Sequence, residues 1–260
     1  MHRLLVESRL LAEEAPVLPA DAARHLRVVR PKPGEQVELF DGHGSFRVYV
    51  WDGGFRSQSN IRTIEHSSNS LTLFACVTKG SRWDWTVEKA TELGVTRIVP
   101  VLSDRTIVRI PRAERAAKRE RWMRIAEDAA RQSDAKWLPE ITEPVDFADS
   151  LDLVRETTCF IGALTTPPSP PLLQALEHSN NPISRTLEQS DHSNNLNNRT
   201  LEHFPLATFI GPEGDFTPDE LAALMKVAVP VSFGPTILRA ETAAVFALSV
   251  LSAYVGTGER

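Results

Sequence analysis

The sequence predicts an α/β fold with a mostly parallel sheet, preceded by a small β domain. After residue 70, short apolar runs alternate with stretches of helical periodicity, which is the pattern of a sheet covered by helices. The first 65 or so residues show period-two segments instead. The length of 260 residues, with 42% hydrophobic content, is enough for one substantial core or two modest ones. We therefore expect two domains, at residues 1–68 and 71–260.

A β-hairpin is expected in the first domain. Val37–Phe40 and Phe46–Trp51 have the composition of strands, and the turn residues Asp41-Gly42-His43-Gly44 separate them. The polar residues 67–70 are a candidate linker to the second domain. There, five apolar segments are expected as buried strands: Leu71–Val77, Arg97–Val101, Thr158–Leu164, Leu206–Ile210 and Pro230–Phe233.

Helix starts in the second domain are marked by capping residues. Ser81 with Asp84 predicts a capping box at the start of a helix that ends at Gly94. The segment Thr217–Glu220 combines a cap, a first-turn proline and the reciprocal acid, and it predicts a helix whose apolar stripe extends to Ala228.

Two further segments of this domain are unusual. Ala243–Leu251 is apolar on nearly every side, so we expect it to pack against its own sheet and against a second subunit. The tract 177–204 is rich in Asn and Ser and contains an imperfect internal repeat. Such a composition cannot bury enough apolar area to offset the entropy of ordering, so we expect a mobile surface insertion at about residues 178–203.

Composition excludes several classes of protein. No window approaches the roughly 20 apolar residues of a membrane-spanning helix, and the N-terminus lacks the apolar core of a secretory signal, so we expect a cytoplasmic protein with no membrane contact. Cys76 and Cys159 each lie in an apolar run without further ligands at metal-binding spacing. We expect both cysteines to be reduced core residues, and no metal to bind.

Basic residues gather in two places although the net charge is -5. Residues 103–124 hold eight basic and three acidic side chains, on a helix expected to begin near Pro111. The second group is Arg24, Arg27, Arg30 and Lys32. Each group is either a solvated surface or a set of phosphate contacts, and the presence of two favours the contacts.

Two glycine-bearing loops are the strongest candidates for a ligand site. Phe209–Phe216 and Phe233–Ala243 each follow a predicted strand, so both lie at the carboxyl edge of the sheet, where open α/β folds bind ligands. We expect the two strands to be neighbours. Gly211, Gly214 and Gly234 would let the backbone approach a ligand closely. Neither loop has the spacing of a P-loop or a dinucleotide-binding turn.

Arg239 lies between the apolar pair Ile237-Leu238 and an apolar helix, so we expect it to be buried and to need an anionic partner. Glu213, Asp215 and Glu241 are internal candidates. An RNA phosphate or a uridine anion are the functional ones.

The chain resembles the ribosomal small-subunit methyltransferase E family, of the SPOUT superfamily. The resemblance extends over most of the length and rests on these segments: Arg24–Arg30, Asp41-Gly42, Lys79-Gly80, Glu88–Gly94, Gln132-Ser133, Pro139–Ile141, Gly211–Asp215 and Ile237–Ala243. It implies a PUA-like β-barrel for RNA, a SPOUT domain with a trefoil knot at about Phe233–Thr242, and a homodimer. It also implies methylation of N3 of a uridine in the 16S rRNA of the small ribosomal subunit, with S-adenosylmethionine as cofactor.

The resemblance and the two loops together predict the site. The cofactor-binding residues are expected to be Leu164, Ile210, Gly211, Gly214, Phe233, Gly234, Ile237, Leu238, Ala240 and Thr242. The candidate catalytic residues are Arg239, to stabilise charge on uracil, with Glu213 or Asp215 as base. The candidate RNA-binding residues are Arg24, Arg27, Arg30, Lys79, Arg105 and Arg109.

The sequence departs from the family at three places. Asp134-Ala135 stands where relatives often have Gly-Arg, and Lys136 or Arg131 is a candidate replacement for the missing arginine. Asp215 stands where relatives often have glycine, and the polar tract at about residues 178–203 is longer than the family leads us to expect. Asp134 is also a third candidate for the base. An inactive RNA-binding protein is therefore the main alternative function. A small-molecule α/β enzyme, which would need neither the β domain nor the basic groups, is the other.

Overall fold

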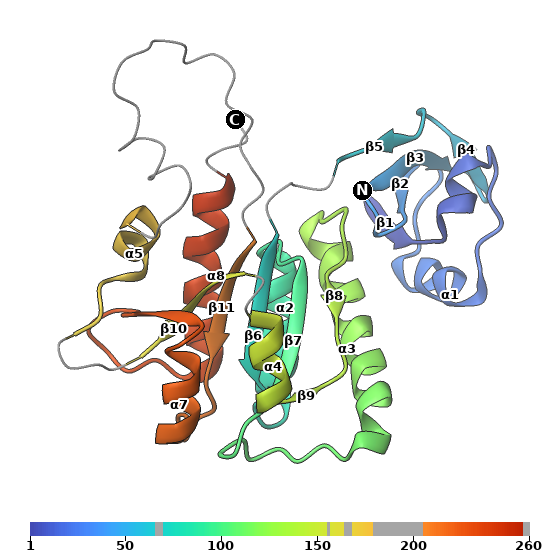
Figure 1. The fold of residues 1–260 in the computed structure, drawn as a ribbon. Coiled ribbons are helices and arrows are strands. Elements are labelled where there is room, and N and C mark those ends of the chain that lie inside the picture. Colours follow the sequence, from blue (N-terminus) through green and yellow to red (C-terminus); the bar gives the residue numbers. More distant parts are fainter. Residues whose placement is uncertain (66–69, 155–156, 164–167, 179–204, 257–260) are drawn as a thin grey trace, which may run out of the picture. The chain divides into compact units, whose positions relative to one another are not determined.

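The computed structural model describes residues 1–65, 70–154, 157–163, 168–178 and 205–256. The chain forms two compact units (Figure 1). Unit 1 contains Met1–Ser67 and Met123–Pro139, and unit 2 contains Ser68–Trp122 and Glu140–Arg260. Residues 123–139 thus belong to unit 1 although they follow part of unit 2 in the chain. Almost all of the predicted insertion at residues 178–203 lies outside the described residues.

Unit 1 is built on a five-stranded sheet in the order β1-β2-β3-β4, with β5 also paired to β3. The strands are β1 (His2–Leu5), β2 (Glu35–Phe40), β3 (Ser45–Trp51), β4 (Phe55–Ser57) and β5 (Arg62–Thr63). The predicted hairpin is confirmed, because β2 and β3 pair antiparallel across the turn. The short 3-10 helix η1 (Ser8–Ala12) and helix α1 (Ala20–Val29) pack their leucines onto this sheet.

Unit 2 has a parallel sheet in the order β12-β10-β11-β6-β7-β8, with β9 also paired to β7. The strands are β6 (Leu71–Cys76), β7 (Arg97–Leu102), β8 (Glu140–Ile141), β9 (Val145–Asp146), β10 (Thr158–Gly162), β11 (Leu206–Ile210) and β12 (Ala228–Val231). Every pair among them is parallel, which confirms the predicted fold class. The expectation that the two loop-bearing strands are neighbours is wrong, because β10 lies between β11 and β12.

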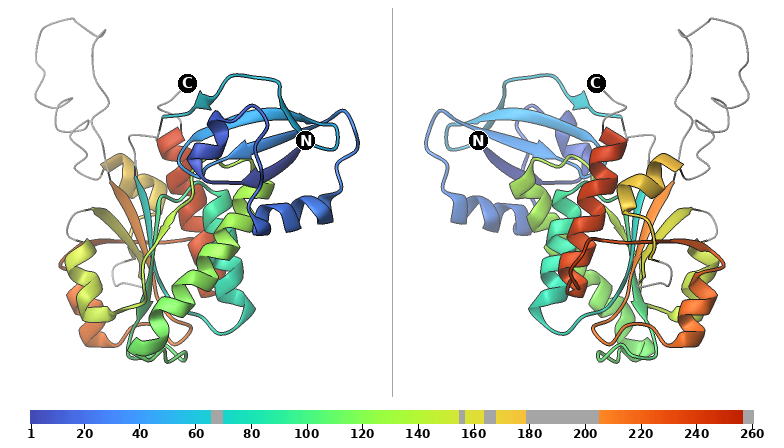
Figure 2. Two further views of the ribbon diagram at one scale, coloured as in Figure 1. Left: turned by 90° about the vertical axis from the view of Figure 1, so that its right-hand side faces the viewer. Right: turned by 90° about the vertical axis from the view of Figure 1, so that its left-hand side faces the viewer.

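Helices cover both faces of this sheet. They are α2 (Ser81–Glu92), α3 (Arg112–Ser133), α4 (Phe147–Val154), α5 (Leu172–His178), α7 (Pro218–Leu224) and α8 (Ala240–Gly256). Figure 2 shows α4 and α7 on one side and α2 and α8 on the other. On the first side, Phe74, Phe209 and Phe216 form the centre of an apolar core. On the second, α3 packs onto α2 through Trp83 and Trp122, whose ring centroids are 5.4 Å apart.

One of the two predicted capping boxes forms. The Thr217 side chain accepts a hydrogen bond from the backbone N–H of Glu220, and the Glu220 carboxylate accepts one from the N–H of Thr217. The other prediction is wrong: Gly80, with φ of 67°, occupies the cap position and Ser81 is the first helical residue. Helix α7 also ends at Leu224, earlier than its apolar pattern indicates, because Ala228 already belongs to β12.

Helix α8 buries most of its apolar surface within its own unit. Ala247 and Leu251 are fully buried, and the helix contacts α2, β6 and β11. Phe246 is 39% exposed. The apolar character of α8 is therefore explained largely by its own sheet and by α2. Among the described residues of this helix, Phe246 is a large apolar side chain that remains exposed.

Candidate active site

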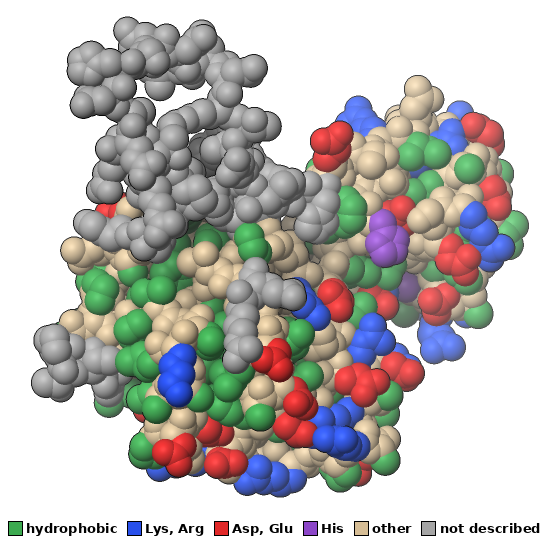
Figure 3. Space-filling view, in the orientation of Figure 1, with side chains coloured by type: hydrophobic (Ala, Val, Ile, Leu, Met, Phe, Trp, Pro, Cys, Tyr) green, Lys and Arg blue, Asp and Glu red, His purple; other side chains and the backbone are tan. Residues whose placement is uncertain are grey.

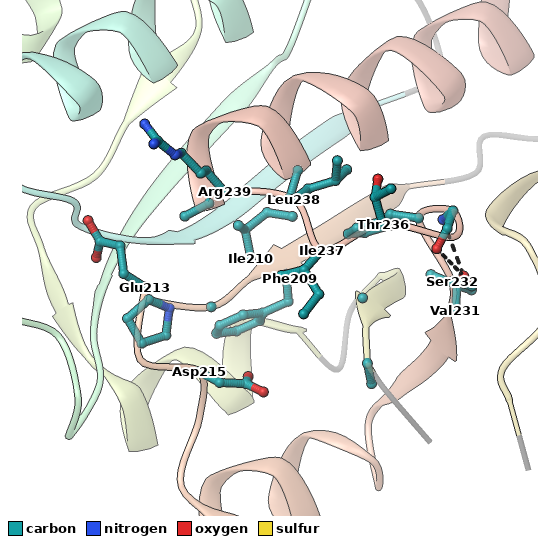
Figure 4. Close-up of a pocket in the computed structure, with 18 residues that line it drawn as sticks. Phe209, Ile210, Glu213, Asp215, Val231, Ser232, Thr236, Ile237, Leu238 and Arg239 are labelled. Carbon is teal, nitrogen blue, oxygen red and sulfur yellow. Dashed lines mark hydrogen bonds between the residues drawn. The ribbon is translucent and has the colours of Figure 1, made fainter. Parts of the chain in front are cut away.

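A cavity of about 360 Å³ lies at the carboxyl ends of three strands of unit 2, and Figure 4 shows the side chains that line it. It is formed by the end of β10, the loop after β11 and the loop between β12 and α8. Of the predicted cofactor residues, the following line it: Ile210, Gly211, Phe233, Gly234, Ile237, Leu238 and Ala240. All three candidate catalytic residues, Arg239, Glu213 and Asp215, line it as well.

The other three predicted cofactor residues are not among the residues found to line this cavity, for two different reasons. Leu164 lies outside the described residues. Gly214 and Thr242 are described but do not line the cavity. The functional roles of all these residues stay predictions.

Sequence reasoning missed part of the lining. Gly162, Ala163, Val231 and Ser232 lie outside both predicted loops. Four more lining residues belong to the predicted loops but were not named as cofactor residues: Phe209, Pro212, Thr236 and Ala243. Gly162 is the most informative of the missed residues, because a Cβ there would lie 2.4 Å from a ring carbon of Phe233. That ring also packs on Phe246, with the centroids 5.8 Å apart. A glycine at the end of a strand is a known signal of close approach, and it could have pointed to this position.

The loop between β12 and α8 is shaped by Ser232 and Gly234. Gly234 has φ of 119°, a conformation that side-chain-bearing residues rarely adopt. Its N–H lies 3.2 Å from Ser232 Oγ, and the Ser232 hydroxyl donates to the Gly234 carbonyl at 3.3 Å. These two contacts, drawn as dashed lines in Figure 4, fix the turn at one end of the cavity.

The loop after β11 is held by hydrogen bonds to its backbone. Arg105 donates from Nη1 to the carbonyls of Gly214 and Phe216, at 2.9 and 3.2 Å. Asp215 adopts φ of 59°, and its Oδ1 accepts the Phe216 N–H at 2.7 Å. A glycine would adopt this conformation freely, and aspartate is among the few other residues that tolerate it. The replacement of glycine by Asp215 is therefore compatible with this turn.

Charged residues gather at the other end of the cavity. Arg82 Nη1 lies 3.4 Å from Glu213 Oε1, and Arg82 Nε lies 3.8 Å from Glu241 Oε1. Arg82 thus links the loop after β11 to the first turn of α8. The Glu241 Oε2 atom is buried and has no hydrogen-bond partner among the described residues.

Arg239 differs from the sequence-based expectation. It is exposed, and the described residues include no ion pair or hydrogen bond of its side chain. The predicted burial is wrong because Ile237, the apolar neighbour on which it relied, is itself 88% exposed in the loop. Figure 4 shows Arg239 and Glu213 at one end of the cavity and Thr236 at the other. The guanidinium is therefore free to meet an anion from outside the chain.

The candidate replacements for the missing arginine lie in unit 1 and are engaged there. Lys136 Nζ contacts Glu38 Oε1 at 2.5 Å and Asp134 Oδ1 at 2.7 Å, and its side chain is only 9% exposed. Glu38 also binds Arg3 at 2.8 Å.

The hydrogen bond from Lys136 and the charges of Lys136 and Arg3 lower the pKa of Asp134. A carboxylate of lowered pKa is a weaker proton acceptor, which makes Asp134 the least suitable of the three candidate bases. Arg131 pairs with Glu127 and Asp128.

The predicted RNA-binding residues are all exposed: Arg24, Arg27, Arg30, Lys79, Arg105 and Arg109. Arg109 donates hydrogen bonds to the backbone carbonyls of Ser103 and Asp104. Arg105 also donates to backbone carbonyls. A carbonyl carries no net charge, so these hydrogen bonds leave the positive charges of both guanidinium groups in place. Much of the positive charge of α3 is paired instead, since Arg112 and Arg115 bind Asp146. Figure 3 shows the same mixture of positive and negative side chains on one face of unit 2.

The described residues also bear on metal binding, membrane insertion and thiol chemistry. They contain no group of three potential metal ligands, and none of their helices is both long and apolar enough to cross a membrane. Cys76 and Cys159 are buried and free. Burial raises the pKa of the Cys76 thiol to about 12 and raises that of Cys159 as well.

Comparison with known proteins places the chain in a family. The family model described as an RNA methyltransferase domain matches residues 65–252. The ribosomal RNA small subunit methyltransferase E of Synechocystis is 31% identical, over 98% of this chain and 78% of its own. The chain belongs to the ribosomal RNA small subunit methyltransferase E family. The Bacillus subtilis member of this family is 27% identical, over 97% of this chain and 96% of its own.

Solved structures of methyltransferases agree with this family. A family member from Neisseria gonorrhoeae, bound to S-adenosyl methionine, has a TM-score of 0.75 and 26% identity, covering 98% of both chains. A putative methyltransferase of Legionella pneumophila, in complex with the same cofactor, has a TM-score of 0.71 and 25% identity, covering 97% of both chains.

Proposed function

We propose that this chain transfers a methyl group from S-adenosylmethionine to N3 of a uridine in the 16S rRNA of the small ribosomal subunit. The observation that carries the proposal is the cavity at the ends of β10, β11 and β12, lined by the two predicted glycine-bearing loops. Membership of a family named for ribosomal RNA methylation supports the substrate class. The cofactor-bound relative from Neisseria gonorrhoeae supports the choice of cofactor.

The cavity fits such a cofactor in size and lining. Its volume of about 360 Å³ is within the range of small-ligand sites. Ile210 and Leu238 offer apolar surface, and the Gly211 and Gly234 backbones offer polar groups without a side chain in the way. When bound there, S-adenosylmethionine would supply an electrophilic methyl group on a sulfonium.

Arg239, Glu213 and Asp215 would act on the uridine. As the uridine N3 gives up its proton, negative charge develops on the uracil carbonyl oxygens. This charge is cancelled when N3 takes the methyl group, whose bond to the cofactor sulfur would break in the same step. The exposed Arg239 guanidinium can hold that charge and stays protonated, so it stabilises and does not remove the proton. Glu213 and Asp215 are the carboxylates that line the cavity and can accept the proton. Arg82 restrains Glu213 from the side of α2.

The finer architecture is part of the same proposal. We assign residues 1–68 to a PUA-like β-barrel that binds RNA, and residues 71–260 to a SPOUT domain with a trefoil knot at about Phe233–Thr242. A homodimer is supported by Phe246, an apolar side chain of α8 that is 39% exposed beside the cavity residue Phe233. A ribosomal substrate would place the enzyme in the cytoplasm.

The proposal is tested by incubating the full chain with isolated small ribosomal subunits and cofactor labelled in the methyl group. Label should enter 16S rRNA, and large subunits should remain unlabelled. Cofactor binding without transfer to either subunit would instead favour the inactive RNA-binding protein. Absence of both cofactor and RNA binding would exclude the proposal.

A further inference from the structure

A second cavity of unit 2, of about 240 Å³, lies between the start of α2 and the first half of α3. It is separate from the proposed cofactor cavity, since the two share no lining residue. Gly80 and Ser81 contribute the start of α2, and Lys118 and Arg121 contribute side chains from α3. The first backbone N–H groups of a helix have no partner within the helix, and here no side chain caps them. This end of α2 therefore favours an anion.

Two residues that line the cavity carry buried polar atoms without partners, and these atoms point to a ligand independently of the helix. The Thr78 hydroxyl and the Trp83 indole N–H are buried and have no hydrogen-bond partner among the described residues. Thr78 is 3% exposed and Trp83 is 2% exposed. A buried donor without a partner costs free energy, so native proteins rarely retain one that nothing uses. Two residues with such donors in the lining of one small cavity indicate a group with several acceptor oxygens.

The charges that line this cavity favour an anion with a hydroxyl group beside it. Arg121 pairs with Asp84, which leaves the charge of Lys118 in excess, because no ion pair of Lys118 occurs in the described part of the chain. The other carboxylate oxygen of Asp84, Oδ1, is buried without a partner. This carboxylate oxygen can only accept a hydrogen bond. It would therefore repel an anion placed directly beside it, but it would accept a hydrogen bond from a neighbouring O–H group.

We propose that this cavity binds one backbone phosphate of the RNA substrate, with Asp84 accepting a hydrogen bond from an adjacent ribose 2′-hydroxyl. Lys118, the start of α2, Thr78 and Trp83 would donate to the phosphate oxygens. The inference rests on the proposed function for the identity of the RNA, but RNA binding can be measured without methyl transfer. A phosphate site of this kind positions the substrate and does not read its sequence.

The first test measures binding of a uridine-containing single-stranded RNA oligonucleotide to the full chain at several salt concentrations. Lys118→Ala should weaken binding about tenfold, as expected for a hydrogen bond to a charged group. It should also lower the slope of log affinity against log salt by about 0.7, the value for one phosphate contact on a single strand. The matched control is Lys226→Ala, which removes an exposed lysine outside the cavity and should change neither quantity.

The second test separates a ligand site from a structural pocket. Thr78→Val keeps the shape of the side chain and removes an unpartnered buried hydroxyl, so it should raise the Tm of the free protein by about 3 °C while weakening RNA binding. A purely structural hydroxyl would give the opposite sign for stability and no change in RNA affinity, and that result would overturn the proposal.

A third test addresses the hydroxyl. The wild-type protein should prefer RNA to DNA of the same sequence, and Asp84→Ala should narrow this preference. Equal affinity and equal salt slope for wild type and Lys118→Ala, in a protein that binds RNA and methylates it, would overturn the phosphate site and leave the proposed function intact. Wild-type protein that binds no RNA would overturn both. Tight binding of inorganic phosphate with RNA binding independent of Lys118 would assign the cavity to free phosphate and also overturn the proposal.

Discussion

Arg239 offers a charge that its own chain leaves unused. It is exposed, it lines the cofactor cavity, and no carboxylate among the described residues pairs with it. An exposed guanidinium contributes little to folding, because water already solvates it. We therefore expect Arg239 to act on a molecule that enters the cavity. Its role as the charge-stabilising group stays a prediction, which now rests on the exposure of the guanidinium and no longer on its burial.

Replacing Arg239 should separate activity from stability. Arg239→Ala should reduce methyl transfer by about two orders of magnitude, the typical loss for one preorganised charge-stabilising group. The Tm and the cofactor affinity should hardly change. Arg239→Lys should recover part of the rate, since an ammonium lacks the planar fork. Normal transfer by folded Arg239→Ala protein would remove this residue from the mechanism.

Gly162 and Gly234 should control cofactor affinity for different reasons. A Cβ at Gly162 would meet the Phe233 ring at 2.4 Å, and Gly234 has φ of 119° with open space around it. Gly162→Ala should displace the ring, and Gly234→Val should strain the backbone, so each should weaken S-adenosylmethionine binding in calorimetry. Gly54→Ala is the control, because Gly54 has open space and no left-handed φ. Unchanged affinity in both variants would mean that the cofactor binds elsewhere.

At the scale of elements, the sequence was informative where pattern and end signals agreed. The bounds of β11 and the capping box of α7 match the prediction. Predictions that depend on tertiary contacts were wrong. Ser81 resembles a helix cap, but Gly80 occupies the cap position with a φ that glycine favours. The apolar Ile237 indicated that Arg239 would be buried. Ile237 lies in a loop, however, and a loop has no regular apolar face that packs against the core. Gly162 was missed because the backbone approach it allows comes from Phe233, far along the chain.

The two predicted capping boxes allow a paired test of helix stability. Thr217→Ala removes the side-chain oxygen that accepts the Glu220 N–H at the start of α7, and it should cost about 1 kcal/mol, or about 3 °C in Tm. Ser81→Ala should be nearly neutral, because Ser81 is the first helical residue and not the cap. Chemical denaturation of both variants measures the difference. Equal losses would show that Ser81 does cap α2 in solution.

At the scale of the whole molecule, the proposed dimer depends on the exposed side of α8. Charges at Ala247 or Leu251 would not test it, because both residues are buried in the core of unit 2. Phe246→Glu places a charge on a side chain that is 39% exposed, and it should shift sedimentation toward a monomer with reduced transfer. Phe246→Leu, which keeps an apolar contact with Phe233, is the control. A Phe246→Glu dimer of normal activity would exclude this surface as the interface.

The central claim is that the cavity at the ends of β10, β11 and β12 serves methyl transfer to a uridine of 16S rRNA. The most direct measurement is to treat small ribosomal subunits, isolated from cells without this activity, with the protein and S-adenosylmethionine, and then to map the modified nucleotide. One uridine methylated at N3 is expected, and the Gly234→Val variant should leave it unmodified. Methylation of another base or atom, or none by protein that binds the cofactor, would contradict the account.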